Sequence, residues 1–260
     1  MDFLIVFLWF IFFIYLFYFL YSLFSYKLLL NRLKKIDFPY TDFLNSIPEY
    51  HKLSKDLQLK IKYSILLFMK TKQFVGVGVE VDDKKMVQIS FFACLLVLNK
   101  NQCYDNLKYI YLYPVSLLKE RVEKEGGVFI KKNFLIAGEK INESVILGWD
   151  ENNGQIYMIK NRINSLTILK REIKEEKYKK LIDRFQQLGE YKLKEWIDLL
   201  EIDTKLLFSE KEIEDYYQQP YLLSEITIIY IELFFRDSKF LKQNFPTIFK
   251  KLSKVFNVKM

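Results

Sequence analysis

The chain has 260 residues, 51% of them hydrophobic, so it can form one large domain, or one domain with a membrane anchor. Its formal net charge is +8, but most of the basic residues are lysines that alternate with glutamates, as on solvated helix faces, and this argues against nucleic acid as a partner. Two cysteines, Cys94 and Cys103, are too few for a disulfide framework, and His51 is the sole histidine.

The N-terminal region contains a long uncharged run over residues 3–24. A helix of that length spans roughly 33 Å, which is enough to cross the hydrocarbon core of a bilayer. The run lacks the basic leader, the short apolar region and the small-residue cleavage site of a signal peptide. It therefore predicts a transmembrane anchor over residues 1–26, with the lipid bilayer as its partner. A very hydrophobic core helix is the alternative.

Basic residues follow this run closely, whereas only Asp2 precedes it. The basic residues are Lys27, Arg32, Lys34 and Lys35. An excess of lysine and arginine marks the cytoplasmic side of a spanning helix. We therefore expect a single-pass protein of the cytoplasmic (inner) membrane, with its N-terminus outside and its body in the cytoplasm. A juxtamembrane linker is expected over 27–47, and a folded domain over 48–260.

The first half of the body predicts helices and then strands. Apolar residues recur at helical spacing over 53–72, and the almost wholly apolar run 86–99 predicts a buried helix. Residues 74–85, between the two, are expected to be extended or to form a turn. Further along, residues 108–114 predict a strand that ends at its proline.

The second half predicts a few more strands and then helices to the end. Residues 126–150 are expected to form two or three short strands, with turns at their glycine pair and around Asn142. From Asn164 the chain is expected to be helical to about residue 200. Two more helices are expected, one covering 224–235 and the last over 246–256. Helices, a small sheet and helices again indicate an α+β domain.

Motif searching finds no catalytic residue and no cofactor site. The segment GVGVE at 76–80 lacks the third glycine and the strand-to-helix unit of a dinucleotide fingerprint. A second feature is unusual, because Glu225 and Glu232 lie seven apart in the apolar segment SEITIIYIELFF. This spacing places both acids on one helix face, where burial is costly unless the carboxylates are paired.

An ordered series of segments resembles a known family. The series runs FVGVGVEV, MVQISFFACLLVLN, IYLYP, the pair Gly138–Glu139, VILGW, and finally SEITIIYIELFF followed by FPTIFKKLSKVF. In this order and spacing, the chain is similar to the zinc-dependent peptidases of the Mlc titration factor A type over most of residues 48–257. The resemblance implies a zincin-like metallopeptidase-type domain with a small sheet and several helices.

The resemblance also implies where the zinc site of the family would fall. Counting from the asparagine that precedes the family's H-E-x-x-H motif, the two histidine positions fall on Ile168 and Glu172, and the general base falls on Leu169. Glu225 matches the third ligand. No histidine follows His51, so we expect no catalytic residue, no bound metal and no cofactor. The remaining carboxylates would suit Mg²⁺ or Ca²⁺ better than zinc.

Three basic residues lie close to the vacated ligand positions, namely Lys170, Arg171 and Lys174. We predict that Arg171 or Lys170 forms an ion pair with Glu225 and replaces the bracing that the metal provides in the family. The alternative is that Glu225 is a partly exposed acid near a helix start, stabilised by the helix dipole.

These observations favour a membrane-anchored, catalytically inactive relative of the peptidases that acts by binding protein. It would serve as a scaffold, a regulatory protein or a subunit of a membrane complex. One alternative is a hydrolase or peptidase with a divergent site. Another is a purely structural subunit of a membrane complex.

Overall fold

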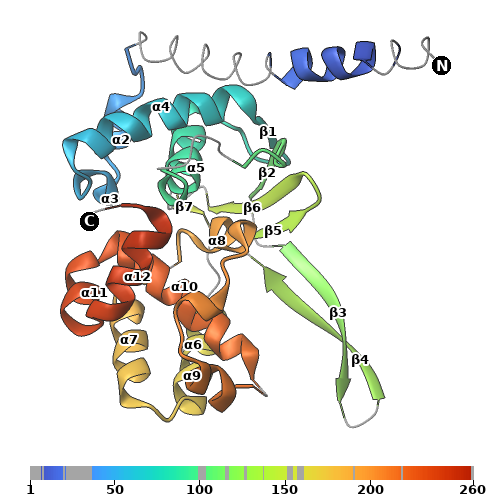
Figure 1. The fold of residues 1–260 in the computed structure, drawn as a ribbon. Helices are drawn as coiled ribbons and strands as arrows, with labels where there is room; N and C mark the ends of the chain where they lie inside the picture. The colour runs from blue at the N-terminus through green and yellow to red at the C-terminus, as the bar shows by residue number, and fades with distance from the viewer. Residues whose placement is uncertain are drawn as a thin grey trace.

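A computed structural model describes most of the chain. The described residues are 7, 9–19, 21, 37–98, 104–114, 117–125, 128–136, 138–150, 155–156, 161–189, 191–217 and 219–258. Figure 1 shows an N-terminal helix and a larger body, residues 37–258, in which helices surround a small sheet. Of the expected anchor and linker, residues 1–6, 8, 20 and 22–36 lie outside the described ranges.

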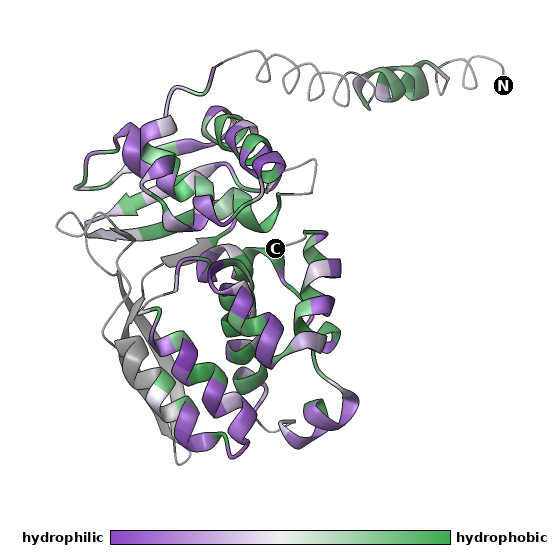
Figure 2. Cartoon of the chain, turned by 90° about the vertical axis from the view of Figure 1, so that its left-hand side faces the viewer, coloured by the Kyte–Doolittle hydropathy of each residue, from purple (hydrophilic) through white to green (hydrophobic). Residues whose placement is uncertain are grey.

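The N-terminal helix covers residues 9–19 and consists mainly of large apolar side chains, as the colouring of Figure 2 shows. These side chains are exposed, Phe17 by 75% and Tyr18 by 72%. In the described part of the chain, no helix is both long enough and apolar enough to cross a membrane.

The body begins with two short helices, α2 (Thr41–Asn45) and α3 (Pro48–His51). Leu44 is fully buried in the main core, so part of the expected linker packs on the body. The long helix α4 (Lys55–Thr71) follows. The hydroxyl of its N-cap residue, Ser54, accepts a hydrogen bond from the backbone N–H of Leu57. The helix expected over 53–72 is thereby confirmed.

A short strand and a tight bend connect α4 to the next helix. Strand β1 (Gln73–Gly76) ends at a glycine whose missing Cβ would lie 2.0 Å from the carbonyl oxygen of Val79. Gly78, at the centre of the bend, has a φ of +74°, which favours glycine. The two glycines of the segment GVGVE therefore shape a backbone bend.

Helix α5 (Asp83–Leu96) is the buried helix that the sequence predicts, although it starts three residues earlier than expected. The side chain of Asp82 accepts a hydrogen bond from the backbone N–H of Lys85 at 2.7 Å and caps the helix. This cap ends the extended segment sooner than the apolar pattern alone indicates. Helix α5 packs on α4, and ten of its residues are buried.

The sheet is mixed. Strand β2 (Tyr109–Tyr113) lies between β1 and β6 (Ser144–Asp150) and is parallel to both, while β5 (Gly138–Ile141) pairs antiparallel with β6. The turn between β5 and β6 contains Asn142 with a φ of +52°, which confirms the expected turn. The short β7 (Gln155–Ile156) pairs with the end of β6.

Two strands form a separate antiparallel ribbon. Strand β3 (Leu117–Glu125) pairs with β4 (Val128–Ile136) along its whole length. Figure 1 shows this ribbon projecting from the body. The strands expected within residues 126–150 are therefore β4, β5 and β6.

The stretch that was expected to be helical, from Asn164 to about residue 200, contains three helices. These are α6 (Asn161–Glu172), α7 (Glu176–Gln186) and α8 (Lys194–Leu200). The first break follows from packing, because the side chain of Ile173 turns into the core and is fully buried there. Gly189, with a φ of +83°, lies in the second break.

The C-terminal part is helical and centres on α10 (Pro220–Arg236), which has thirteen buried residues. Before it come a 3₁₀ turn (Thr204–Leu206) and α9 (Glu210–Asp215). After it come α11 (Ser238–Asn244) and α12 (Pro246–Phe256), which pack against α10 and against each other. Both α10 and α12 start at a proline in the first turn, and both helices expected here are confirmed.

The substitution Gly76→Ala should destabilise the body by about 3 kcal/mol, because the new Cβ overlaps the backbone of Val79 and the bend must shift. Gly189→Ala is the matched control, since its Cβ would meet nothing within 4 Å and only the positive φ is unfavourable. Its expected cost is about 1 kcal/mol. Urea unfolding in detergent, followed by tryptophan fluorescence, measures both. Equal losses of stability in the two variants would contradict the close approach of the Val79 carbonyl to Gly76.

Candidate functional site

The two acids of α10 lie in different environments. Glu232 has no exposed surface, and its Oε1 accepts hydrogen bonds from the backbone N–H groups of Lys192 at 2.8 Å and Leu193 at 2.6 Å. Its Oε2 accepts a third hydrogen bond from Arg236 at 3.2 Å. The carboxylate is therefore satisfied on both oxygens, as a buried acid requires.

Arg236 extends this contact into a buried ion network. Its Nε lies 3.3 Å from Oε1 of Glu49, on α3, and its Nη2 donates to the carbonyl of Leu188 at 3.3 Å. Lys192 lies 3.8 Å from the same oxygen of Glu49. The network therefore joins α3, the turn between α7 and α8, and the last turn of α10.

Burial and pairing act on Glu232 in opposite directions. Removal from water raises the pKa of its carboxyl, whereas the Arg236 guanidinium and the two backbone N–H groups favour the charged form. Such a carboxylate is held by its partners and has no accessible lone pair for a ligand. This second acid of the helix is structural.

Glu225 is half-buried, near the start of α10. It accepts a hydrogen bond at 3.1 Å from the hydroxyl of Tyr191, a buried residue in the turn before α8. One turn earlier on α10, the hydroxyl of Tyr221 donates to the carboxylate of Glu172, at the end of α6. This hydrogen bond raises the pKa of the Tyr221 hydroxyl to about 12. The two acids expected at former ligand positions, Glu172 and Glu225, thus both accept hydrogen bonds from tyrosines. Helix α10 takes part in both contacts, through Tyr221 and through Glu225.

Helix α6 covers the positions that correspond to the zinc motif. Leu169, at the general-base position, is 4% exposed and belongs to the main hydrophobic core. Ile168 lies in the helix, but its side chain is outside the described part of the structure. A leucine in the core can neither bind a metal nor transfer a proton.

The basic residues of α6 that were expected near Glu225 have the following environments in the structure. Lys170 pairs with Asp183 of α7, and Arg171 is exposed. Among the described residues, which include Lys170, Arg171 and Glu225, neither basic residue forms an ion pair with Glu225. The replacement pair stays a prediction, and the contact observed at Glu225 is the Tyr191 hydroxyl.

The donors do not fit the zinc site of the resembling family. That site needs two imidazoles on one helix, and His51 lies instead on α3, where its Nε2 is 2.8 Å from the carbonyl oxygen of Asn45. Across the described ranges, no group of three or more His, Cys, Asp or Glu side chains could hold a metal.

A second cluster of ionisable groups lies between α7 and α9. Glu212 accepts hydrogen bonds from Lys177, Tyr178 and Ser209, the last of these as a capping box. Burial alone would raise the pKa of Glu212, but these donors outweigh it and lower the pKa to about 2. Glu212 therefore fastens α9 to α7.

Sequence reasoning missed four residues that organise this region: Arg236, Glu49, Tyr191 and Tyr221. One local signal was present, because Glu232 and Arg236 are four residues apart on a helix, a spacing at which opposite charges pair. The other contacts join segments that are distant in the sequence.

The comparisons with known proteins agree with the motif series. A family model described as glucose-regulated metallo-peptidase M90 matches residues 32–166, which is more than half of the chain. This is the family of Mlc titration factor A, so the expected resemblance is confirmed. The matched range ends just before Ile168, and the former ligand positions lie beyond it. No curated protein matches the chain.

Removing the cation of the buried network should be costly. Arg236→Met leaves Glu232 and Glu49 buried without their guanidinium, and we expect a loss of about 3–5 kcal/mol in the free energy of unfolding. Lys194→Met is the matched control, because it breaks an i,i+4 pair with the exposed Asp198 and should cost less than about 1 kcal/mol. Urea titration of both variants measures the difference. Similar losses would contradict a network that stabilises the body.

Proposed function

Because the chain belongs to the M90 family of glucose-regulated metallopeptidases, we propose that it is a non-catalytic member of that family, anchored in the cytoplasmic membrane, which acts by binding protein. The peptidase scaffold is kept in this proposal, and the hydrolytic chemistry is lost. The protein serves a membrane complex as a scaffold, a regulator or a subunit.

The observation that carries the proposal is the chemistry of α6. The general-base position holds Leu169, which lies in the hydrophobic core, and the chain has no histidine after residue 51. A zinc peptidase needs a metal-bound water and a base beside it. The leucine side chain at the base position cannot accept a proton, and without the two histidines the helix lacks the ligands that would hold a metal-bound water.

The carboxylates that remain support the same conclusion. Glu172 and Glu225 each accept a hydrogen bond from a tyrosine hydroxyl, Tyr221 and Tyr191 respectively. These contacts connect α10 with α6 and with the turn before α8. In the family, a metal ion would join the helices that correspond to α6 and α10. The tyrosines thus provide a bracing that needs neither a metal nor a salt bridge.

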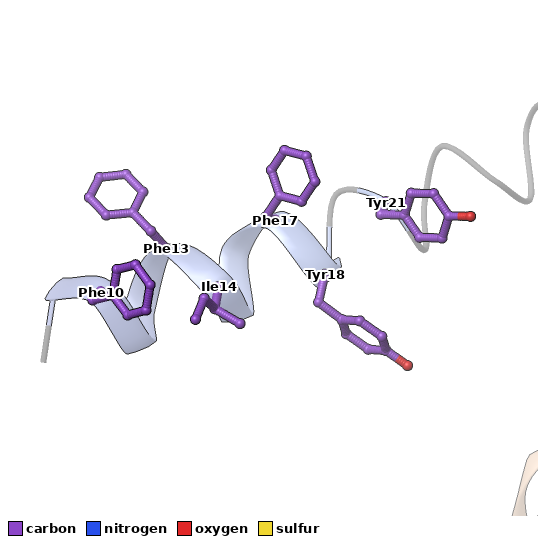
Figure 3. A pocket seen from close by; sticks show the side chains of 6 residues that line it. All are labelled: Phe10, Phe13, Ile14, Phe17, Tyr18 and Tyr21. Atoms are coloured by element: carbon purple, nitrogen blue, oxygen red, sulfur yellow. The ribbon is translucent and has the colours of Figure 1, made fainter. Parts of the chain in front are cut away.

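The N-terminal helix supports membrane attachment. Figure 3 shows Phe13 and Phe17 on one side of this helix and Ile14 and Tyr18 on the other. With Phe10 and Tyr21 they line a shallow groove of about 500 Å³, which is the space between side chains of one helix rather than a ligand pocket. Trp9, Phe12 and Phe19 are exposed as well, and so many exposed aromatic groups on one helix are unfavourable in water and favourable in lipid.

The same helix favours a second candidate function, a purely structural subunit of a membrane complex. Exposed aromatic side chains can pack against other membrane helices as well as against lipid. Co-purification in mild detergent separates the two possibilities. A scaffold retains its partner through the body after the N-terminal run is replaced by an unrelated spanning helix, whereas a subunit assembled through this run loses it.

The purified full-length protein should contain no stoichiometric zinc and should cleave no peptide. Elemental analysis and a casein-degradation assay measure these two properties. One zinc per chain, lost in Glu225→Ala, would overturn the proposal. Peptide cleavage that resists chelators would favour a hydrolase with a divergent site.

A gain-of-binding variant provides the control. Ile168→His together with Glu172→His restores two imidazoles at i and i+4 on α6, with Glu225 as the third donor. We expect this variant to bind about one zinc per chain and to unfold at a higher temperature with zinc than without it. Adding Glu225→Gln should remove most of this binding. Failure of the double variant to bind zinc would mean that these three positions do not converge.

The C-terminus should lie in the cytoplasm, because the basic residues of the sequence follow the apolar run and do not precede it. A reporter enzyme that is active only outside the cytoplasm, fused after Met260, should be inactive. The same reporter fused before Met1 should be active. Strong activity of the C-terminal fusion would reverse the topology.

A further inference from the structure

Helix α4 has two apolar faces. Its inner face holds Ile61, Ile65 and Phe68, which are fully buried in the core. On the other side of the helix, Leu59 is 54% exposed, although it is a large apolar residue. Tyr63 lies four residues further on and is only half-buried.

The apolar residues of this second side form a stripe. Leu59, Tyr63 and Leu66 have the i, i+4, i+7 spacing that places side chains on one helix face, and Leu66 is half-buried like Tyr63. We call this stripe and the lysines beside it the outer face of α4. A core helix of a soluble domain needs only one apolar face, so the outer face requires an explanation.

Lysines surround this stripe. The helix carries Lys55, Lys60, Lys62 and Lys70, of which all but Lys62 are exposed. Asp56 is the only acid in the helix. Lysine can lay its alkyl chain along an apolar surface while its ammonium group reaches the phosphates of lipid headgroups. An apolar stripe with lysines on both sides is typical of helices that lie in the membrane interface.

The chain itself holds α4 near the bilayer. Lys62 lies 5.7 Å from the ring centre of Phe38, so the start of the body contacts the middle of α4. Thirteen residues separate Phe38 from the end of the uncharged run at Phe24. Even fully extended, these residues span only about 45 Å. Four of them are basic, and an anionic surface attracts such residues.

We propose that the outer face of α4 is a membrane-docking surface that binds anionic lipid. In this arrangement, Leu59 enters the headgroup layer and the lysines contact lipid phosphates. The inference rests on the proposed membrane anchor, and it adds a defined orientation of the body against the membrane. It also leaves α9, at the end of the body opposite α4 in Figure 1, facing the cytoplasm.

The test uses the full-length chain with a polarity-sensitive fluorophore on a single introduced cysteine. Cys103→Ser is included so that the buried Cys94 is the only other thiol. One protein carries the label at Leu59→Cys. The control carries it at Tyr217→Cys, directly after α9, where the side chain is 80% exposed. Both are reconstituted into vesicles of phosphatidylcholine, with or without phosphatidylglycerol.

In vesicles with phosphatidylglycerol, we expect the emission of the label at position 59 to shift to the blue and to be quenched by brominated lipid. The label at position 217 should show neither effect. Reversing the charges with Lys55→Glu, Lys60→Glu and Lys70→Glu should abolish the shift while the protein still sediments with the vesicles. Circular dichroism identifies any reversal variant that fails to fold, and single reversals then replace it, each with a smaller loss of shift.

The other outcomes each overturn a defined part of the argument. A protein that does not stay with the vesicles after a carbonate wash would refute the anchor. A retained protein without a shift at position 59 would refute only the docking surface. An equal shift without phosphatidylglycerol would refute the role of the lysines. A shift in lipid-free detergent that grows with protein concentration would identify a second copy of the chain as the occupant.

Discussion

The buried guanidinium of Arg236 is the contact on which the arrangement of the body depends. It binds Glu232 on its own helix and Glu49, which is 187 residues away in the sequence, and it also reaches the carbonyl of Leu188. Buried charges are stable only when their partners are held in place. The two other segments that carry these partners, α3 and the turn after α7, must therefore keep fixed positions around α10.

The same constraint applies to the candidate site, whose helices are held together by polar contacts at both ends of α10. In the metal-binding members of such a fold, a doubly charged ion holds ligand helices together. Here the tyrosine–carboxylate pairs join α6 and the turn before α8 to the start of α10, and the Arg236 network fastens its end. Hydrogen bonds and one ion network thus support the helix at both ends. Tyr191 is buried and donates through its hydroxyl, as tyrosine in apolar surroundings commonly does, whereas Tyr221 is 50% exposed.

Local patterns of residues predicted the helices better than the contacts between them. The apolar run and the proline at its start were enough to identify α10, and the same holds for α12. The breaks around α7 were not predicted, because no proline marks them and the first depends on Ile173 entering the core. In the candidate site, Glu172 and Glu225 were located by resemblance. Their tyrosine partners were not, because these contacts form only when α6, α8 and α10 pack.

The attachment of α3 to the end of α10 also has a mechanical consequence. Lys52 donates a 2.5 Å hydrogen bond to the carbonyl of Arg236, and Glu49 bonds to its guanidinium. Tension applied at the N-terminal side of the body therefore loads the last turn of the most buried helix, as well as α5, on which α2 packs. Both contacts thus tie the start of the body directly to the end of its most buried helix.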